Sequence, residues 1–264
     1  MQLMPQSMGI DQYVAALVWL SSVLWPLGLL DQAIECSRRS LAHAEALDKP
    51  RTLTFALLMT GALSDLQCDD LAAAEAKVNR ARRLAIEKEI TTLRHVANVY
   101  AGYVCVWRGA AQEGIALMQA GLGAWRASGA TSGIVQHYVL LAKAQQVAGE
   151  TDAGLETVAE ALGLIERHGT RYNEAELWRI RGELLAQQGE MEAAESSLAH
   201  AIAVAQGQQA RLWELRALIS LCRLRQKEGR QADVLPQLAA LYTWFTEGHT
   251  LPDLQAAQVL LAAA

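Results

Sequence analysis

Two glycine-rich segments have spacings that could bind a phosphate group, but each lacks residues that this chemistry requires. Gly109–Gly114 has the spacing of a phosphate-binding loop, yet Ile115 and Ala116 stand where lysine and serine or threonine are needed. Gly121–Gly123 begins a dinucleotide-binding pattern, yet Arg126 stands in the place of its final glycine. We therefore expect no nucleotide site in these segments and no cofactor.

Residues that could bind a metal or act as a nucleophile are scattered along the chain. The six histidines include no H-E-x-x-H motif and no i,i+4 pair, so the sequence predicts no metal site. Gly129–Gly133 has the wrong spacing for a nucleophile elbow, and the four cysteines form no C-x-x-C pair. Glu190 and Glu192 fit the first turn of a helix, where the helix dipole favours negative charge. We expect no catalytic residue, no enzyme activity and reduced cysteines in a cytosolic protein.

The remaining candidate chemistry is recognition of a partner by aromatic and charged side chains that recur every 40 residues. If the first helices of successive hairpins line an inner face, these side chains form a groove that is first aromatic and then charged. An amphipathic or acidic peptide would fit such a surface. The candidate partner-binding residues are Val99, Tyr103, Trp107, Gln136, Lys143, Glu176, Arg179, Glu183, Arg216 and Arg223.

The charged members of this set also have a purely structural interpretation. Lys143, Glu183 and Arg223 alternate in sign, as do Glu176 and Arg216, so the side chains could pair with one another. Exposed pairs of this kind contribute only about 0–1 kcal/mol each to stability. Structural pairing and partner recognition are both open at this point.

The elements that position these residues are copies of one helical hairpin. In residues 176–203, large and very small residues alternate at helical spacing on both sides of Gly189, so two antiparallel helices can approach closely. A helix pair this thin cannot bury its apolar face alone and needs copies of itself on either side. The turn glycines recur every 40 residues, at Gly109, Gly149, Gly189 and Gly229, and the small residues of the first helix do so at Ala62, Gly102, Ala142, Gly182 and Cys222.

The repeat offsets W-x-x-x-G-x-x-L…A-x-x-x-L-x-x-A resemble the tetratricopeptide (TPR) pattern, lengthened beyond its usual period. The predicted fold class is therefore all-α, a right-handed TPR-like α–α superhelix of six helical hairpins with a C-terminal closing helix. We expect a single solenoid domain over residues 1–264. The expected hairpins are about 11–48, 52–88, 92–127, 134–168, 174–206 and 211–245, and the closing helix is about 252–264.

The composition fits such an array and argues against several classes of function. Hydrophobic residues make up 52% of the chain and charged residues only 19%, which provides apolar surface for contacts between hairpins. The formal net charge of −5 lacks the basic excess of a phosphate-binding face, so we expect no nucleic-acid binding. Residues 12–30 carry no charge, but Pro26 interrupts them before a membrane could be spanned. We expect no membrane association and a cytoplasmic location.

The first hairpin is crowded with apolar side chains. Tyr13, Val14, Leu17, Val18 and Leu20 leave its first helix without a polar outer side, whereas the ends of a solenoid need a polar cap. The sequence therefore indicates an array cut in its middle or one that docks against another domain. The alternative is a homodimer that forms through this hairpin.

The second half of the chain resembles a known bacterial family. The segments Ala175–Leu185, Leu212–Ala217, Ser220–Leu224 and Tyr242–Leu254 carry the resemblance, and Leu27–Ala33 is similar to the preceding repeats of the same array. Members of this family are multidomain signalling proteins. In them a class III adenylate or guanylate cyclase, or a winged-helix transcriptional regulator, precedes a P-loop ATPase and this helical array.

The resemblance implies a non-catalytic protein–protein interaction and sensing module that controls an ATPase, cyclase or transcriptional output domain. The alternatives are a solenoid that senses a small molecule and a fragment of a cyclase or ATPase whose catalytic domains are absent here. None of those catalytic activities is expected from these residues. Leu251 stands before Pro252 where the family pattern leads us to expect a capping threonine, so we expect a loosely closed last helix.

Overall fold

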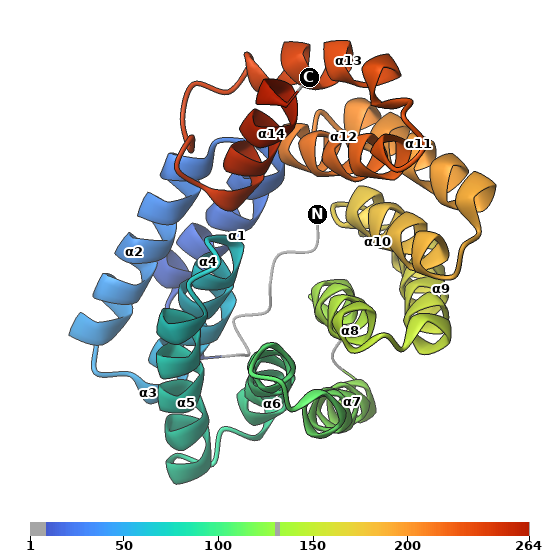
Figure 1. Ribbon diagram of the computed structural model, residues 1–264. Helices are drawn as coiled ribbons and strands as arrows, with labels where there is room; N and C mark the ends of the chain where they lie inside the picture. Colours follow the sequence, from blue (N-terminus) through green and yellow to red (C-terminus); the bar gives the residue numbers. More distant parts are fainter. Residues whose placement is uncertain (1–8, 130–132, 264) are drawn as a thin grey trace. The chain divides into compact units, whose positions relative to one another are not determined.

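The protein is all-α throughout the part of the chain that the structure describes. The structure, a computed structural model, describes residues 9–129 and 133–263, and every regular element in these ranges is helical (Figure 1). Residues 1–8 of the expected domain and residue 264 of the expected closing helix lie outside these ranges. The chain divides into two compact units, the first containing residues 9–24 and 31–129 and the second residues 25–30 and 133–263.

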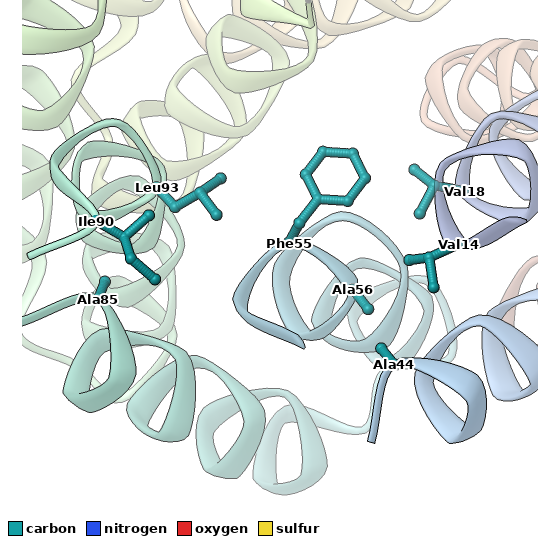
Figure 2. Packing of buried hydrophobic residues seen from close by; sticks show 8 residues of the cluster. All are labelled: Val14, Val18, Ala44, Phe55, Ala56, Ala85, Ile90 and Leu93. Carbon is teal, nitrogen blue, oxygen red and sulfur yellow. The ribbon is translucent and has the colours of Figure 1, made fainter. Parts of the chain in front are cut away.

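The first unit is built from helices that pack as antiparallel neighbours. Its core gathers small and branched aliphatic side chains around Phe55, with Val14 and Val18 on one side and Ile90 and Leu93 on the other (Figure 2). The helices are α1 (Gln12–Leu27), α2 (Leu30–Ala46), α3 (Pro50–Ala56), the π-helix η2 (Leu57–Ala62), α4 (Leu63–Gln67), α5 (Leu71–Glu87), α6 (Thr91–Trp107) and α7 (Ala111–Ala127). The end of α1 and the first residue of α2 fall in residues 25–30, which belong to the second unit.

One helix of this unit contains a π-helical segment that the sequence did not indicate. The first helix of the hairpin expected at about 52–88 is observed as α3, η2 and α4, with η2 forming a wider turn of the backbone. Thr60 lies within this segment, and its hydroxyl donates a hydrogen bond to the Ala56 carbonyl oxygen over 3.0 Å. Ser197 in α11 and Ser220 in α12 make the same kind of bond within regular α-helix, so back-bonding alone does not produce the π-helical segment.

The second unit repeats the hairpin with its first helices side by side. Helix α10 contacts both α8 and α12, so three first helices form one row, and α14 packs against α12 and α13. The helices are α8 (Ile134–Ala148), α9 (Thr151–His168), α10 (Glu174–Gln187), α11 (Met191–Gly207), α12 (Arg211–Gln226), the 3₁₀ helix η3 (Gln231–Asp233), α13 (Leu235–Tyr242) and α14 (Pro252–Ala262).

Glycines in the helices allow the two members of a hairpin to touch. A Cβ atom on Gly102 in α6 would lie 2.3 Å from the Gly114 carbonyl oxygen in α7, far inside van der Waals contact. On Gly182 in α10 it would lie 2.7 Å from Leu198 Cγ in α11. The small residues of the repeat are therefore the points of closest approach between paired helices.

The turns between paired helices use the residues that the repeat predicted. Gly149 has φ 76° and Gly189 φ 85°, a left-handed conformation that glycine adopts without steric penalty. In the second hairpin Asp69 takes the corresponding conformation with φ 58°, and the Asp70 carboxylate accepts a hydrogen bond from the Ala73 amide over 2.9 Å. These turns allow each helix to return antiparallel to the one before it.

Candidate functional site

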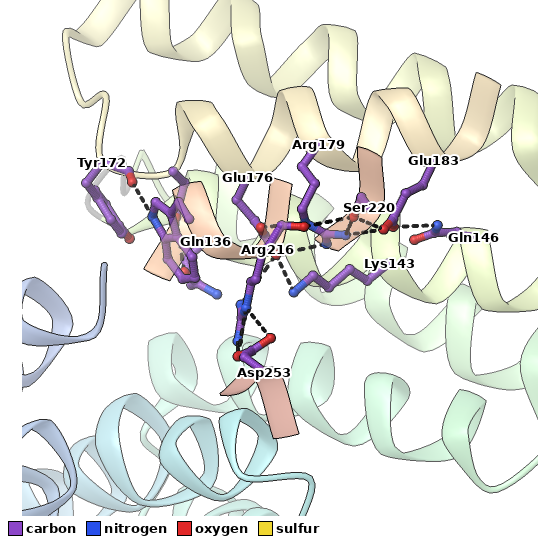
Figure 3. A network of polar contacts seen from close by, with 12 residues as sticks. Gln136, Lys143, Gln146, Tyr172, Glu176, Arg179, Glu183, Arg216, Ser220 and Asp253 are labelled. Carbon is purple, nitrogen blue, oxygen red and sulfur yellow. Dashed lines mark hydrogen bonds and ion pairs between the residues drawn. The ribbon is translucent and has the colours of Figure 1, made fainter. Parts of the chain in front are cut away.

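The centre of the second unit is a buried carboxylate surrounded by three cations. Glu176 on α10 has only 1% of its side chain exposed, yet its oxygens lie 2.6 Å from Lys143 Nζ on α8 and 2.8 Å from Arg179 Nε (Figure 3). Arg216 on α12 approaches it to 3.5 Å. Because α8, α10 and α12 lie side by side, one carboxylate joins three consecutive hairpins.

These cations keep the buried carboxylate ionised. Burial by itself disfavours the charged form and would raise the pKa of Glu176, but the charges of Arg179, Lys143 and Arg216 outweigh that effect. The pKa of Glu176 therefore lies well below its ordinary value. In the same way, burial lowers the pKa of Lys143, and the neighbouring Glu176 charge acts against this decrease.

Arg179 extends the network along α10. Its guanidinium contacts Glu176 on one side and lies 2.5 Å from Glu183 on the other. Glu183 also accepts hydrogen bonds from Gln146 on α8 over 2.8 Å and from the Ser220 hydroxyl on α12 over 2.6 Å (Figure 3). A second carboxylate thus links the same three helices further along α10.

Arg216 connects the network to the last helix of the chain. Its Nε lies 2.9 Å and 3.0 Å from the two carboxylate oxygens of Asp253 on α14, and its Nη2 lies 2.7 Å from the second of them. The guanidinium also lies over the Trp213 ring, 4.9 Å from its centroid. Trp213 in turn donates its indole N–H to the Tyr172 carbonyl oxygen over 2.9 Å. The Arg216 guanidinium is therefore held by Asp253, the Trp213 ring and Glu176.

Many of these contacts join residues that are 37 apart in the sequence. The offset is close to the 40-residue repeat less one helical turn, as expected when the first helices of successive hairpins lie side by side with a small shift. The pairs are Gln136 with Asn173, Gln146 with Glu183, Glu183 with Ser220, and Arg216 with Asp253.

Sequence reasoning did not single out Gln146, Asn173, Ser220 or Asp253. The signal that would have found them is this offset of 37, applied to each polar candidate in turn. The full repeat of 40 corresponds in the structure to the longer contact between Arg216 and Glu176.

The structure brings five predicted site residues together as ion-pair partners. Lys143, Glu176, Arg179, Glu183 and Arg216 belong to one network. The contact between Glu176 and Arg216 is one that the alternation of signs suggested, whereas Lys143 contacts Glu176 and Glu183 contacts Arg179. The exposed fractions of the Lys143 and Glu183 side chains are 22% and 26%, so the network still reaches the surface.

The other candidate residues lie outside this network. Gln136 is buried and accepts a hydrogen bond from the Asn173 amide over 3.0 Å, while Arg223 is exposed on α12. Val99 and Tyr103 are buried in α6 of the first unit. Trp107, also on α6, is 50% exposed, and its ring centroid lies 6.2 Å from that of Tyr103.

No chemistry of metals or membranes is indicated within the described ranges. Among residues 9–129 and 133–263, no three histidine, cysteine, aspartate or glutamate side chains are grouped so that they could hold a metal ion. None of the helices in these ranges is both long and apolar enough to span a bilayer. The arrangement consists of charge pairs that link successive hairpins.

Comparison with solved structures places this architecture among helical-repeat proteins. A Rap protein crystallised with Competence and Sporulation Factor superimposes with a TM-score of 0.66 over 95% of this chain and 73% of its own, at 11% sequence identity. The fold is TPR-like. A signal transduction ATPase with numerous domains from Pyrococcus horikoshii, which has a tetratricopeptide repeat sensor, superimposes with a TM-score of 0.58 over 95% of this chain and 38% of its own, at 13% identity.

Two further comparisons complete this result. BtubC from P. vanneervenii gives a TM-score of 0.56 at 17% identity and covers 89% of this chain and 91% of its own. An uncharacterized protein of Rhizobium meliloti (strain 1021) is 27% identical over 214 residues, which are 81% of this chain and 21% of that protein. The chain thus spans about a fifth of the curated relative that it matches. No family model matches the sequence.

Proposed function

We propose that this chain is a non-catalytic protein–protein interaction and regulatory module that controls an ATPase, cyclase or transcriptional output domain. TPR-like domains typically mediate protein–protein interactions. The observation that carries the proposal is the row of charged side chains held on α8, α10 and α12, which buried partners fix in position and which reaches the surface at Lys143 and Glu183. A surface of this kind binds peptides with little loss of side-chain entropy.

The similar proteins support a regulatory role in two ways. The Rap protein was crystallised with a factor, and the Pyrococcus horikoshii protein combines a signal transduction ATPase with a TPR sensor. The Rhizobium meliloti relative is about five times longer than the matched region, which leaves room for an output domain in that protein. The coding sequence adjoining this chain tests this part of the proposal, since an in-frame cyclase, winged-helix or ATPase region there would supply the output domain.

The partner we propose is an amphipathic peptide that carries carboxylates. An acidic side chain would approach Lys143, whose side chain is 22% exposed, and an apolar side chain would lie against the neighbouring helices. Because each cation already has an internal counter-charge, binding would rest on shape and hydrogen bonds as much as on net charge.

A displayed library of amphipathic peptides, panned on the whole chain, tests this function. Selected peptides should bind Lys143→Gln about tenfold more weakly than the wild type in a fluorescence-polarisation titration, because one surface cation is removed. The matched control is Lys227→Gln, which neutralises an exposed lysine outside the network and should leave binding unchanged. Equal weakening by both substitutions, or no selected peptide at all, would contradict the proposed surface.

Self-association through the first hairpin is a second candidate, and it rests on a separate observation. Leu20 and Val23 on α1 are 48% and 54% exposed, and α1 carries no charged residue. Apolar positions spaced in this way fit a second copy of the same helix. Sedimentation velocity should show a dimer that Leu20→Glu converts to a monomer, and a wild type that is monomeric at every concentration would remove this candidate.

A further inference from the structure

The closing helix α14 is attached to the rest of the second unit by few side chains. It packs against α12 and α13, and its buried side chains are Leu254 and Ala257. Val259 on its outer side is 67% exposed. Leu251, at the N-cap position before the helix, is buried, but its side chain has no polar atom that could cap the helix. The apolar anchors of this eleven-residue helix are thus Leu254, Ala257 and the preceding Leu251, with Leu260 and Leu261 half-buried at its other end.

The polar anchor of α14 is the contact between Asp253 and Arg216. Two nitrogens of the guanidinium face the carboxylate, with distances from 2.7 to 3.0 Å (Figure 3). Such a fork fixes direction as well as charge. Asp253 lies in the first helical turn, where the helix dipole also favours a negative side chain.

The Arg216 side of this contact is held in place independently of α14. Arg216 lies over the Trp213 ring and also pairs with the buried Glu176. These contacts would keep its guanidinium in position if α14 moved away. A preformed cation beside an apolar surface on α12 and α13 is then available to another helix of similar pattern.

We propose that α14 occupies a helix-binding site on α12 and α13 and exchanges with an amphipathic helix of a partner protein. The partner helix carries a carboxylate in its first turn, followed by a leucine and, three residues later, a small residue, as in Asp253, Leu254 and Ala257. The helix seated on the site provides the template for this occupant, and Arg216 provides the complementary charge. The inference rests on the proposed partner-binding role and names a place and a partner class for it.

The test uses the full chain and a synthetic peptide of residues 249–264 that carries a fluorophore and two added lysines for solubility. We expect the double variant Asp253→Asn, Leu254→Ala to bind this peptide at least about tenfold more tightly than the wild type, because its own α14 is released. A peptide with asparagine in place of Asp253 should bind the same variant about tenfold more weakly. Equal affinities in either comparison would overturn the proposal.

Hydrogen exchange of the same variant shows whether the protein remains folded. The amides of α14 should exchange at least about tenfold faster than in the wild type, while those of α8, α10 and α12 keep their protection. Unchanged exchange in α14 would also refute an exchangeable helix. The control Glu192→Gln in the double-variant background neutralises an exposed carboxylate on α11 and should leave binding of the α14 peptide unchanged. If the α14 peptide does not bind as expected, the exchange of α14 is refuted, but the proposed interaction function is not.

Discussion

At the scale of single residues, Glu176 is the buried carboxylate that contacts three cations in the second unit. Its carboxylate is almost completely buried and serves three cations that come from three hairpins. A buried ion pair is not by itself strong evidence of stabilisation, because desolvation offsets much of the attraction. Removal of one partner is different, since it leaves the remaining charges buried and uncompensated.

The substitution Glu176→Gln should therefore destabilise the second unit markedly. We expect a loss of about 3 kcal/mol in the free energy of unfolding, because Lys143, Arg179 and Arg216 lose their shared counter-charge. Urea unfolding followed by circular dichroism measures this loss. The control Glu192→Gln neutralises an exposed carboxylate on α11 and should change stability by less than about 0.5 kcal/mol. Similar effects of the two substitutions would mean that the network contributes little.

His137 on α8 makes stability depend on pH. Burial lowers the pKa of this imidazole from about 6.5 to about 4, so the folded protein holds it neutral. In the unfolded chain the same group takes up a proton as pH falls through 6.5, so more protons are bound by the unfolded state between pH 6.5 and 4. Stability contributed by neutral His137 is therefore complete above pH 6.5 and decreases towards pH 4.

We expect wild-type stability to fall by about 2 kcal/mol from pH 7.5 to pH 5 through this residue. The measurement is urea unfolding at both pH values. His137→Gln has no titratable group at this position, so its loss over the same interval should be smaller by that amount. Parallel pH profiles for the two proteins would show that His137 is not buried as a neutral group.

At the scale of elements, the contact between paired helices depends on residues without a side chain. Gly102 faces the backbone of α7, which cannot move aside, and the nearest neighbour of Gly182 is a leucine side chain that can adjust. Gly123, also in α7, has open space on its outer side, with no atom within 4 Å of the point that a Cβ would occupy. The same substitution to alanine therefore measures two different effects on stability. At Gly102 it measures the cost of a steric clash between helices, and at Gly123 it measures the gain in helix propensity alone.

Gly102→Ala should destabilise the protein by about 1–3 kcal/mol, because the added methyl group forces α6 and α7 apart. Gly123→Ala should instead stabilise it by about 0.5–1 kcal/mol, since alanine favours the helix and meets no neighbour. Thermal or urea unfolding of the two variants gives the signs directly. A stabilising Gly102→Ala would contradict the close approach of the two helices.

At the scale of the whole molecule, a repeat array distributes its stability through contacts between neighbouring hairpins. The first unit is joined by an apolar core around Phe55, while the second adds a chain of ion pairs from Lys143 to Asp253. A substitution in one hairpin should therefore lower the local stability of the hairpins that it contacts before that of more distant ones.

Hydrogen exchange of Glu176→Gln tests this locality. Amides of α8, α10 and α12 should lose protection because these helices share the carboxylate, whereas those of α6 and α7 should keep their wild-type rates. Mass spectrometry of peptide fragments resolves the helices. Equal loss of protection in all of these helices would indicate that the chain unfolds as one cooperative block.

The sequence by itself determined the repeat, because close packing of helices requires small residues at fixed intervals and left-handed turns favour glycine. Both requirements are local, so Gly102, Gly182 and the turn glycines could be recognised from spacing alone. The helix type of Leu57–Ala62 could not, since nothing in the composition of this segment marks a widened turn.

Only the tertiary structure decided which charged residues pair. The repeat placed Lys143, Glu176, Arg179, Glu183 and Arg216 on neighbouring helices, but pairing depends on the shift between those helices. That shift selects an offset of 37 and brings Asp253 to Arg216. Burial of Glu176 likewise depends on side chains from three separate hairpins, because desolvation and charge act through space and not along the chain.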